Sequence, residues 1–528
     1  MPSLVTLDRV AFSTPDGRVL FEDLTLALGA EKTGLVGRNG AGKTTLARLI
    51  LGELAPAAGT VSAEGRIATL RQQHAPPPGA RLKDLIGVAE GLDRLARLER
   101  GEGAAADLEA VDWSLPQRAA EALAEMGLGG LDLETPADAL SGGQATRAAL
   151  AALLVAGPDM LVLDEPTNNL DAEGRALVAA MLHRWPGAAL VISHDRALLT
   201  RMDRIVELTG MGAKAYGGGY DHYAAQKAAA EAAAERRLQR AEADLARTEG
   251  SIQAERERKA RRDAAGRRSR APDDMPKLWL DAQKERAGST SHRLSRAADR
   301  RRSVAAAELG SARAEVEIHR SLGFDLPPSG LPNAKLVLAV EHVSFAWPGE
   351  APLLVDVSFR IVGPQRLALT GPNGAGKTTL IRLAAGELSP SEGLVRRGAP
   401  GVRLDQRAAL AGDGLSLIET FRRLNPASSH HAAHAALAGF LFRNADALKP
   451  AEALSGGERL RAALACALMA EPPPQLIILD EPTNHLDLAS VLAVERALAA
   501  YDGALLVASH DAAFLAAIGA HEEVRLGG

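Results

Sequence analysis

Two glycine-rich segments of this chain have the spacing of loops that hold phosphate groups. Gly37-Arg-Asn-Gly-Ala-Gly-Lys-Thr-Thr45 occurs again as Gly371-Pro-Asn-Gly-Ala-Gly-Lys-Thr-Thr379. Both match the pattern G-x-x-x-x-G-K-[ST], in which glycines let the backbone curl so that its N–H groups point at a phosphate. We expect Lys43 and Lys377 to neutralise the β- and γ-phosphates. The threonines that follow them, Thr44 and Thr378, would each place a hydroxyl on Mg²⁺.

Acidic side chains follow an apolar segment in each half of the chain. Asp164 and Asp480 end runs that we expect to be buried strands, and a carboxylate there would reach the site beside the glycine loop. Mg²⁺ is a hard cation that prefers oxygen ligands, so both aspartates are candidate metal ligands. The next residues, Glu165 and Glu481, could polarise and orient an attacking water molecule.

One histidine lies downstream of each acidic pair. His194 and His510 each follow the next apolar strand. An isolated histidine is more often structural, but these two follow a glycine loop and an acidic pair in the same order. We therefore expect His194 and His510 to hold the γ-phosphate and the water molecule. Together with Glu165 and Glu481 they are the candidate catalytic residues.

The chain contains the same series of motifs twice. The glycine loop is followed by Leu140-Ser-Gly-Gly-Gln144, Leu163-Asp-Glu-Pro-Thr-Asn168 and Ser193-His-Asp195, and these recur as Leu454-Ser-Gly-Gly-Glu458, Leu479-Asp-Glu-Pro-Thr-Asn484 and Ser509-His-Asp511. The offsets are 334, 314, 316 and 316 residues. The first copy therefore carries about 20 extra residues between 74 and 140. We expect 101–113 to be a loop-rich part of them.

Alternating strands and helices must position these motifs. Each copy begins with a strand-like run (4–12 and 337–345), and further strands lead into the glycine loops (33–36 and 366–369). The predicted helices after the loops are 43–51 and 377–385, and the later strands are 160–163, 189–192, 476–479 and 505–508. Apolar strands that alternate with helices indicate a mostly parallel sheet covered by helices, so the fold class is α/β.

Composition excludes several classes of protein. Of the 528 residues, 46% are hydrophobic and 24% charged, which is typical of a globular chain and excludes global disorder. The net charge of −5 argues against a wholly basic nucleic-acid binder. The single cysteine, Cys466, excludes an intramolecular disulfide and a cysteine-based metal site. The longest apolar runs are about nine residues, whereas a membrane span needs about 20, so we expect no transmembrane segment and a cytoplasmic location.

A segment of different composition separates the two copies. Residues 224–320 contain 23 Lys or Arg and 16 Asp or Glu, a net charge of +7. Leu238, Leu245 and Ile252 repeat every seven residues in an Ala/Glu/Arg background, which predicts a coiled-coil helix. Prolines interrupt it at 272 and 276, and helical spacing resumes over 277–320. We expect a two-helix hairpin with its tip near 263–276, ended by prolines at 327, 328 and 332.

The chain resembles the ATP-binding cassette (ABC) ATPases in its series of motifs: glycine loop, Leu-Ser-Gly-Gly segment, Asp-Glu pair, Asn-Leu-Asp or His-Leu-Asp loop, and histidine, in this order. The resemblance covers about 400 residues and implies two tandem P-loop ABC ATPase domains that pair within one monomer. In that family ATP lies between the glycine loop of one cassette and the Leu-Ser-Gly-Gly signature of the other. The residues implied to bind nucleotide are Gly37, Asn39, Gly40, Gly42, Lys43, Thr44, Thr45, Gly371, Asn373, Gly374, Gly376, Lys377, Thr378, Thr379, Ser141, Gly142, Gly143, Ser455, Gly456 and Gly457.

The resemblance also implies metal and base contacts. Gln72 and Gln406 match the family's glutamine for Mg²⁺ and water, with Gln73 as an adjacent rival. They would complete the set of Mg²⁺ ligands formed by Thr44, Asp164, Thr378 and Asp480. The family often stacks an aromatic ring on adenine after the first strand. Trp347 has that position in the second copy and Thr14 in the first, so the two ATP sites are expected to differ.

Within the family, the chain resembles the ABC-F subfamily, tandem cassettes that act on the ribosome. Gly219-Tyr-Asp-His-Tyr223 is similar to that subfamily's entry to the linker. There the hairpin reaches tRNA or the peptidyl-transferase region. Residues 256–302 contain 16 Lys or Arg against 7 Asp or Glu, which suits RNA but also a solvated coiled-coil face. The implied RNA-binding residues are Arg261, Arg262, Arg267, Arg268 and Arg270.

The predicted organisation is a first ABC ATPase domain at 1–223, a basic helical-hairpin (coiled-coil) linker at 224–330 and a second ABC ATPase domain at 331–528. The predicted function is an ATP-hydrolysing protein that binds the ribosome when closed around ATP, either as a translation factor or in antibiotic resistance. Two alternatives stay open: the ATPase subunit of a transporter with separate membrane subunits, and a DNA-binding ATPase.

Overall fold

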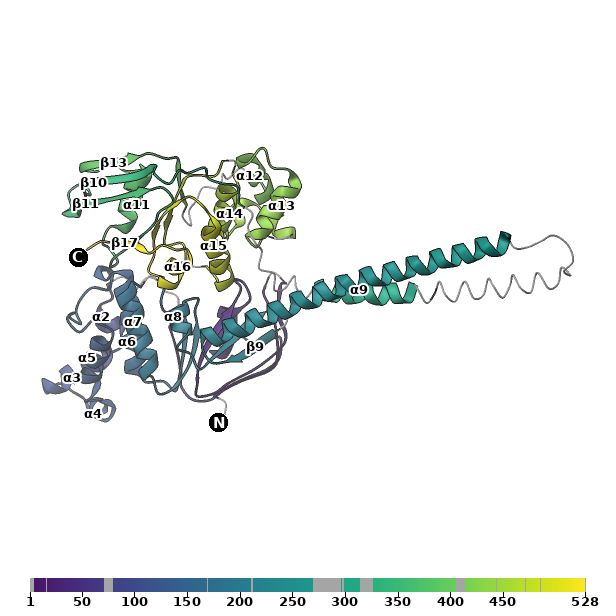
Figure 1. The fold of residues 1–528 in the computed structure, drawn as a ribbon. Helices are drawn as coiled ribbons and strands as arrows, with labels where there is room; N and C mark the ends of the chain where they lie inside the picture. The colour runs from purple at the N-terminus through teal and green to yellow at the C-terminus, as the bar shows by residue number, and fades with distance from the viewer. Residues whose placement is uncertain are drawn as a thin grey trace. The chain divides into compact units, whose positions relative to one another are not determined.

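The computed structural model describes residues 4–15, 17–70, 79–168, 170–209, 212–268, 296, 299–313, 326–404, 414–442, 444–470, 472–484 and 486–527. They form two compact units. Met1–Tyr223 and Gly323–Gly528 together make one unit, which holds both copies of the motif series, and Ala224–Leu322 makes the other. The predicted division of the chain into two ATPase domains, 1–223 and 331–528, with a linker between them, stays a prediction. We call the two halves of the larger unit the first and second cassettes (Figure 1).

A six-stranded sheet lies at the centre of the first cassette, in the order β5-β6-β7-β3-β8-β9. Its strands are β3 (Lys32–Gly37), β5 (Ile67–Leu70), β6 (Met160–Asp164), β7 (Ala188–Ile192), β8 (Arg204–Thr209) and β9 (Gly212–Gly217). All neighbours are parallel except β8 and β9. Because β3, β6 and β7 lie together and run parallel, the glycine loop, the acidic pair and the histidine that follow them emerge at one edge of the sheet.

The second cassette repeats this arrangement with five strands, in the order β14-β15-β16-β12-β17. They are β12 (Arg366–Thr370), β14 (Gly401–Leu404), β15 (Leu476–Asp480), β16 (Ala504–Ala508) and β17 (Glu522–Arg525), and all neighbours are parallel. The mostly parallel sheet predicted from the apolar runs is confirmed in both cassettes. Strands β6, β7, β15 and β16 are almost wholly buried, which explains why they read as continuous apolar runs.

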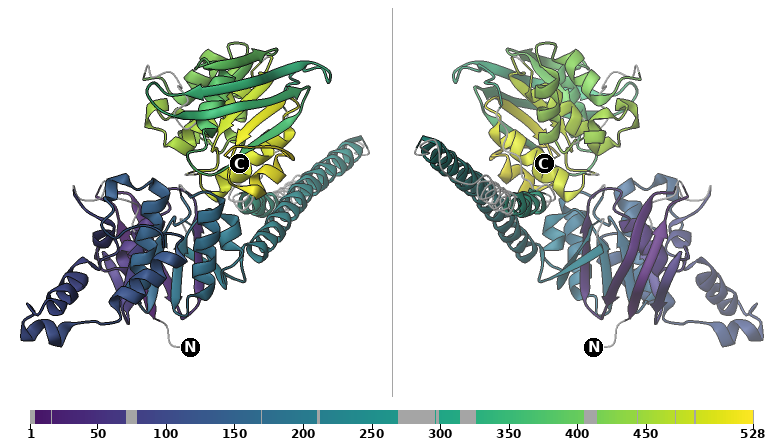
Figure 2. Two further views of the ribbon diagram at one scale, coloured as in Figure 1. Left: turned by 90° about the vertical axis from the view of Figure 1, so that its left-hand side faces the viewer. Right: turned by 90° about the vertical axis from the view of Figure 1, so that its right-hand side faces the viewer.

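Each cassette also has a three-stranded antiparallel sheet. The first is β2-β1-β4, built from β1 (Val5–Ser13), β2 (Val19–Leu28) and β4 (Ala58–Ala63). The second is β11-β10-β13, built from β10 (Leu336–Ala346), β11 (Pro352–Val362) and β13 (Glu392–Arg397). The strands of the second are visible in green in Figure 2. The sequence analysis predicted β1 and β10 but not the antiparallel sheets to which they belong.

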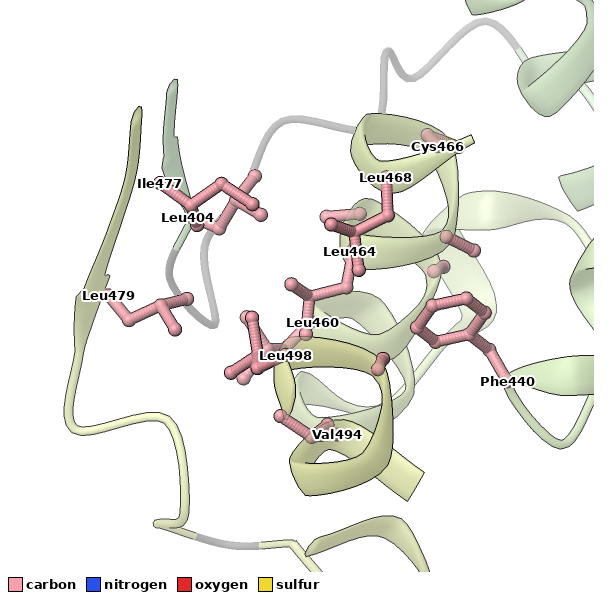
Figure 3. Close-up of a cluster of buried hydrophobic side chains, with 14 of the residues drawn as sticks. Leu404, Phe440, Leu460, Leu464, Cys466, Leu468, Ile477, Leu479, Val494 and Leu498 are labelled. Atoms are coloured by element: carbon pink, nitrogen blue, oxygen red, sulfur yellow. The ribbon is translucent and has the colours of Figure 1, made fainter. Parts of the chain in front are cut away.

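Helices cover the parallel sheets. In the first cassette they are α1 (Lys43–Ile50), α2 (Leu82–Leu85), α5 (Leu115–Glu125), α6 (Gly142–Ala156), α7 (Ala172–Arg184) and α8 (Arg196–Leu199). In the second they are α11 (Lys377–Ala385), α12 (Leu417–Leu424), α13 (His430–Gly439), α14 (Gly456–Leu468), α15 (Leu488–Ala500) and α16 (Ala512–Ala517). Figure 3 shows the leucines of α14 next to Leu404, Ile477 and Leu479 of the sheet, with Phe440 on the other side of the helix.

The first cassette has two further helices, α3 (Ala89–Glu99) and α4 (Ala105–Ala110), within the region expected to hold its extra residues. They project from the first cassette in both views of Figure 2. The expectation that 101–113 is loop-rich was wrong over α4. Arg94 and Arg97 of α3 form ion pairs with Asp107 of α4 at 3.5 and 2.8 Å. These contacts between helices hold α4 in place, and the local spacing of residues did not reveal them.

The linker unit is an antiparallel pair of helices (Figure 1). The long helix α9 (Tyr220–Arg268) pairs with a helix over 299–313. Ion pairs join Glu242 to Arg313, Glu249 to Arg302 and Glu255 to Arg301, at 3.5, 3.4 and 3.6 Å. Ile252, Leu309 and Ala312 are buried. The predicted hairpin is confirmed, although α9 continues to residue 268, so the tip begins later than residue 263.

No described helix is both long and apolar enough to cross a membrane.

Candidate active site

The glycine loops connect a central strand to a helix in both cassettes. Gly42 precedes α1 with a φ of 95°, and Gly376 precedes α11 with a φ of 89°, a left-handed conformation that favours glycine. A Cβ on Gly42 would lie 2.7 Å from the ring of Phe21, so a side chain is also excluded sterically. The Nζ atoms of Lys43 and Lys377 each donate a hydrogen bond to the carbonyl at the start of their own loop, at 2.8 Å.

The two acidic pairs adopt an unusual backbone conformation. Glu165 and Glu481 have φ values of 51° and 45°, although neither is glycine. Each donates its backbone N–H to the neighbouring strand, to Ile192 at 2.8 Å and to Ala508 at 2.9 Å. Such a backbone conformation costs about 1–3 kcal/mol and persists only where the surroundings enforce it. The same strained turn therefore directs an acidic side chain into each site.

Burial dominates the electrostatics of the two glutamates. Desolvation raises the pKa of Glu165 to about 8 and that of Glu481 to about 7, against the opposing charges of Lys43 and Lys377. Both carboxylate oxygens of Glu481 are buried, and no side chain of the described residues donates a hydrogen bond to them. Because a buried, unpaired carboxylate destabilises the fold, such a group is a candidate for a role in a reaction.

The histidines lie next to the glutamates. His194 Nε2 is 3.3 Å from Glu165 Oε1, and His510 Nε2 is 3.6 Å from Glu481 Oε1. Desolvation, followed by repulsion from the neighbouring lysine, lowers the pKa of His194 to about 3 and that of His510 to about 4. Both imidazoles are therefore neutral at pH 7. His510 Nε2 also lies 2.9 Å from Lys377 Nζ, within hydrogen-bond distance.

The oxygen atoms beside the first glycine loop suit a hard cation. The Thr44 hydroxyl donates a hydrogen bond to Asp164 Oδ2 at 2.8 Å. A protein usually offers Mg²⁺ only one or two oxygen ligands, and phosphates and water supply the rest. In the second cassette, Thr378 lies in the first turn of α11 and Asp480 ends β15. The predicted ligands Gln72 and Gln406 lie outside the described residues.

An aspartate from each cassette reaches the glycine loop of the other. Asp487 Oδ2 accepts a hydrogen bond from the backbone N–H of Asn39 at 2.7 Å, and Asp171 Oδ2 accepts one from that of Asn373 at 3.4 Å. Both aspartates also cap a helix, α15 and α7 respectively. The two cassettes therefore pair head to tail. Both aspartates end a loop that is part of the family resemblance, Asn-Leu-Asp in the first cassette and His-Leu-Asp in the second, but the sequence assigned them no role at the site.

A cavity of about 430 Å³ lies at the first glycine loop. Seven predicted nucleotide- or metal-binding residues line it, together with the predicted catalytic pair: Asn39, Gly40, Gly42, Lys43, Thr44, Thr45, Asp164, Glu165 and His194. The second cassette contributes Thr483, Asn484 and Leu486. The structure thus brings these nine predicted residues together in one cavity that both cassettes line, and Gly37 is not among its described lining residues.

The Leu-Ser-Gly-Gly segments do not line this cavity in the described part of the chain. Ser141 and Ser455 are instead the N-caps of α6 and α14, where each hydroxyl accepts a hydrogen bond from a backbone N–H, at 3.2 and 3.3 Å. Gly142 and Gly456 begin these helices, and Gly143 and Gly457 follow. An N-terminal helix end favours an anion, so the segments keep the chemistry expected of them.

The predicted base and RNA contacts are only partly described. The Trp347 ring lies edge-on to Phe345 with 5.1 Å between centroids, and the Arg382 guanidinium lies 5.9 Å from the Trp347 centroid. Of the five predicted RNA-binding arginines, only Arg261 has a described side chain, which is exposed on α9. The side chains of Arg262, Arg267 and Arg268 and all of Arg270 lie outside the described residues.

A second contact between the cassettes involves Arg196, two residues after His194. The Arg196 guanidinium at the start of α8 donates two hydrogen bonds to the Glu495 carboxylate of α15, one of them 3.1 Å long. Asp511 lies 3.6 Å from the same guanidinium. The side chains of Arg196 and Glu495 are only 12% and 8% exposed. Nothing in the sequence spacing of Arg196 and Glu495 predicts that they meet.

Comparison with known proteins places this site in a family. The family model described as "ABC transporter" matches residues 22–168 and 354–484, more than half of the chain, and a second model with that description matches 206–290. The tylosin resistance ATP-binding protein TlrC of Streptomyces fradiae is 34% identical, over 97% of this chain and 96% of its own length. The probable ATP-binding protein YheS of Escherichia coli (strain K12) is 33% identical, over 94% of this chain and 74% of its own length.

Solved structures share the fold. The archaeal ribosome recycling factor aABCE1, solved in a complex with the ribosomal stalk protein aP1, has a TM-score of 0.56 and 19% identity, over 99% of this chain and 87% of its own. At this identity the likeness shows the fold alone. The match of the family model extends over both glycine loops and both acidic pairs. The chain therefore belongs to the ATP-binding cassette family, as an ATPase of its ABC-F subfamily.

Proposed function

We propose that this chain is a ribosome-binding ATPase whose cassettes close around ATP and whose linker hairpin acts on tRNA or the peptidyl-transferase region. The observation that carries the proposal is the reciprocal contact of Asp487 and Asp171 with the opposite glycine loops. Because each loop is completed by the other cassette, ATP bound there would act on both cassettes at once. ATP binding can then close the pair, and ATP hydrolysis can open it again.

At each site the lysine and the glycine-loop N–H groups bind the phosphates. Mg²⁺ fits the oxygen atoms of Thr44 and Asp164, and in the second cassette those of Thr378 and Asp480. It neutralises phosphate charge when bound. Gln72 and Gln406 are proposed as further ligands on the family resemblance.

Hydrolysis needs a base and a group that positions water. Glu165 and Glu481 lie on strained turns, and their side chains are mostly removed from water. The charges of Lys43 and Lys377 lower the pKa values of the two glutamates and so partly oppose the effect of burial. We therefore assign to the glutamates the orientation and deprotonation of the attacking water. His194 and His510 are neutral beside them and can donate or accept one hydrogen bond at Nε2. The signature residues Ser141 to Gly143 and Ser455 to Gly457 would approach the opposite loop when ATP is bound.

The ribosome is the proposed partner on two grounds. The chain belongs to the ABC-F subfamily, and residues 256–302 carry a net charge of +9. Within the hairpin, glutamates of α9 form ion pairs with arginines of the second helix. Arg261 of α9 is exposed, so its guanidinium is accessible to RNA. Planar guanidinium groups bind phosphate and stack on bases, which suits RNA. We also propose that the protein acts as a monomer in the cytoplasm.

Sedimentation with purified ribosomes in ATP tests the proposal. The variant Glu165→Gln, Glu481→Gln should hold ATP without hydrolysing it and co-migrate with ribosomes. A matched variant, Glu64→Gln with Glu392→Gln, removes two exposed carboxylates and should behave like the parent chain. Deletion of 256–302 from the first variant should abolish co-migration. If the first variant binds ATP but never co-migrates, the ribosomal function is wrong, and a membrane partner becomes the next candidate.

A further inference from the structure

The turn between β1 and β2 borders the first glycine loop and lacks the aromatic ring of its counterpart. Thr14 stands where the second cassette has Trp347, and the turn is closed by a hydrogen bond of 2.9 Å from Thr14 N–H to the Arg18 carbonyl. Thr14, Arg18 and Leu20 line the 430 Å³ cavity. No Phe, Tyr or Trp is among its described lining residues. An ATP base in this cavity would therefore need another flat partner.

Arg18 is placed to be that partner. Its Nη2 donates a hydrogen bond to the carbonyl of Gly40 at 3.1 Å, which ties the side chain to the glycine loop. Gly40 has a φ of 76°, and a Cβ there would lie 3.4 Å from Arg18 Nη1, so the guanidinium packs directly on the loop backbone. The residue as a whole is exposed. One edge of the guanidinium is thus held, while the side chain borders the cavity.

We propose that Arg18 holds the nucleobase at the first ATP site, by stacking its guanidinium plane on adenine in place of the missing aromatic ring. Guanidinium planes stack on bases as aromatic rings do. The second site would use Trp347, which is flanked by Arg382. This inference rests on the proposed placement of ATP at the first glycine loop. It makes the two sites chemically different: an arginine platform at the first and an indole platform at the second.

The chemistry of the cavity favours the base over the phosphates as the partner of Arg18. Lys43, Thr44 and the loop N–H groups already serve the phosphate end. Arg18 instead binds a loop carbonyl, and Leu20, which also lines the cavity, offers an apolar side chain that suits the edge of a base. A stacked base therefore has a planar partner and an apolar one.

The test measures ATP binding to the full chain carrying Lys377→Ala. This variant removes the lysine of the second glycine loop, so that the measured ATP binding reports on the first site. Adding Arg18→Ala should weaken ATP binding about tenfold, the effect expected for one lost base stack. Arg18→Lys should weaken it as much, because an ammonium group is not planar. Inorganic tripolyphosphate, which has no base, should bind equally well to all three chains. Arg360→Ala in the same background removes an exposed arginine of β11 and is the matched control, which should leave ATP binding unchanged.

Three results would decide against the inference or its foundation. Unchanged ATP affinity in Arg18→Ala, with binding still lost in Lys43→Ala, overturns the role of Arg18 and leaves the site in place. Rescue by Arg18→Lys, or an equal loss of tripolyphosphate binding, shows a phosphate contact and overturns base stacking. If Lys43→Ala binds ATP normally, the proposed site itself is wrong. Because Arg18 is exposed, its variants should have the same thermal unfolding temperature as the parent chain.

Discussion

The ion pair between Arg196 and Glu495 should control how firmly the two cassettes hold together. Arg196 follows His194 by two residues, and Asp511, which follows His510, is 3.6 Å from the same guanidinium. Burial raises the pKa of Tyr220, the first residue of α9, and the charge of Arg196 opposes that rise. The pair is therefore electrostatically connected to both histidine loops and to the start of α9.

The structure allows an estimate of what the pair contributes. Two unit charges about 4 Å apart attract by about 4 kcal/mol at an effective dielectric constant of about 20. Removing one partner of a buried pair typically costs about 3–5 kcal/mol, because the other charge stays buried. Arg196→Met leaves the buried Glu495 carboxylate and the partly buried Asp511 without their shared guanidinium, so we expect a loss of about 4 kcal/mol in cassette pairing. Glu495→Gln leaves Asp511 to pair with Arg196, so we expect about 2 kcal/mol.

Energy transfer between dyes on the two cassettes would measure this. Cysteines introduced at the exposed positions Leu108 and Val355 accept the dyes, while the native Cys466 is buried. The open-to-closed equilibrium should shift by about a thousandfold in Arg196→Met, as about 4 kcal/mol requires. The double variant Arg196→Met, Glu495→Gln should recover about 2 kcal/mol as coupling energy. Additive single effects, with coupling below about 0.5 kcal/mol, would refute the reasoning.

Single contacts also predict how other variants behave. Asp487→Asn should reduce ATP hydrolysis, measured as phosphate release, more than Asp171→Asn does, because Asp487 makes the shorter bond to the opposite loop, 2.7 against 3.4 Å. Gly42→Ala should lower thermal stability and ATP affinity, whereas Gly52→Ala, with a similar positive φ but open space, should keep ATP affinity. Burial raises the pKa of the Cys466 thiol from 9.0 to about 12, so thiol labelling at pH 8 should be slow until urea unfolds the chain. The thiol's contribution to stability is complete below pH 9.0 and is lost as the pH rises toward 12.

Much of the fold could be predicted because its signals are local. Apolar runs such as 160–163 and 189–192 predict buried strands, and the structure confirms them with shifts of one residue at their ends. The heptad of Leu238, Leu245 and Ile252 predicts the hairpin, which the ion pairs between its helices confirm. Helix α4 and the antiparallel sheets were not predicted, since contacts between separate elements stabilise them and the local pattern of residues does not show those contacts.

The residues of the candidate site also fall into those that the sequence predicts and those that only the structure shows. Glycine spacing alone identifies the loops around Lys43 and Lys377, because a phosphate-binding turn needs glycine at fixed positions. The base contact could not be read so directly. The sequence shows that Thr14 replaces an aromatic residue, but only the structure shows Arg18 bonded to the loop beside it.

The sequence by itself determined the repeated architecture, the residue types at each site and the basic hairpin, because these depend on spacing and composition along the chain. The tertiary structure alone decided that Asp487 meets Asn39, that Arg196 meets Glu495, and that Glu165 is buried enough for its pKa to reach about 8. Those facts depend on distances between residues up to 448 positions apart and on the exclusion of water. Neither quantity is encoded in the local pattern of residues.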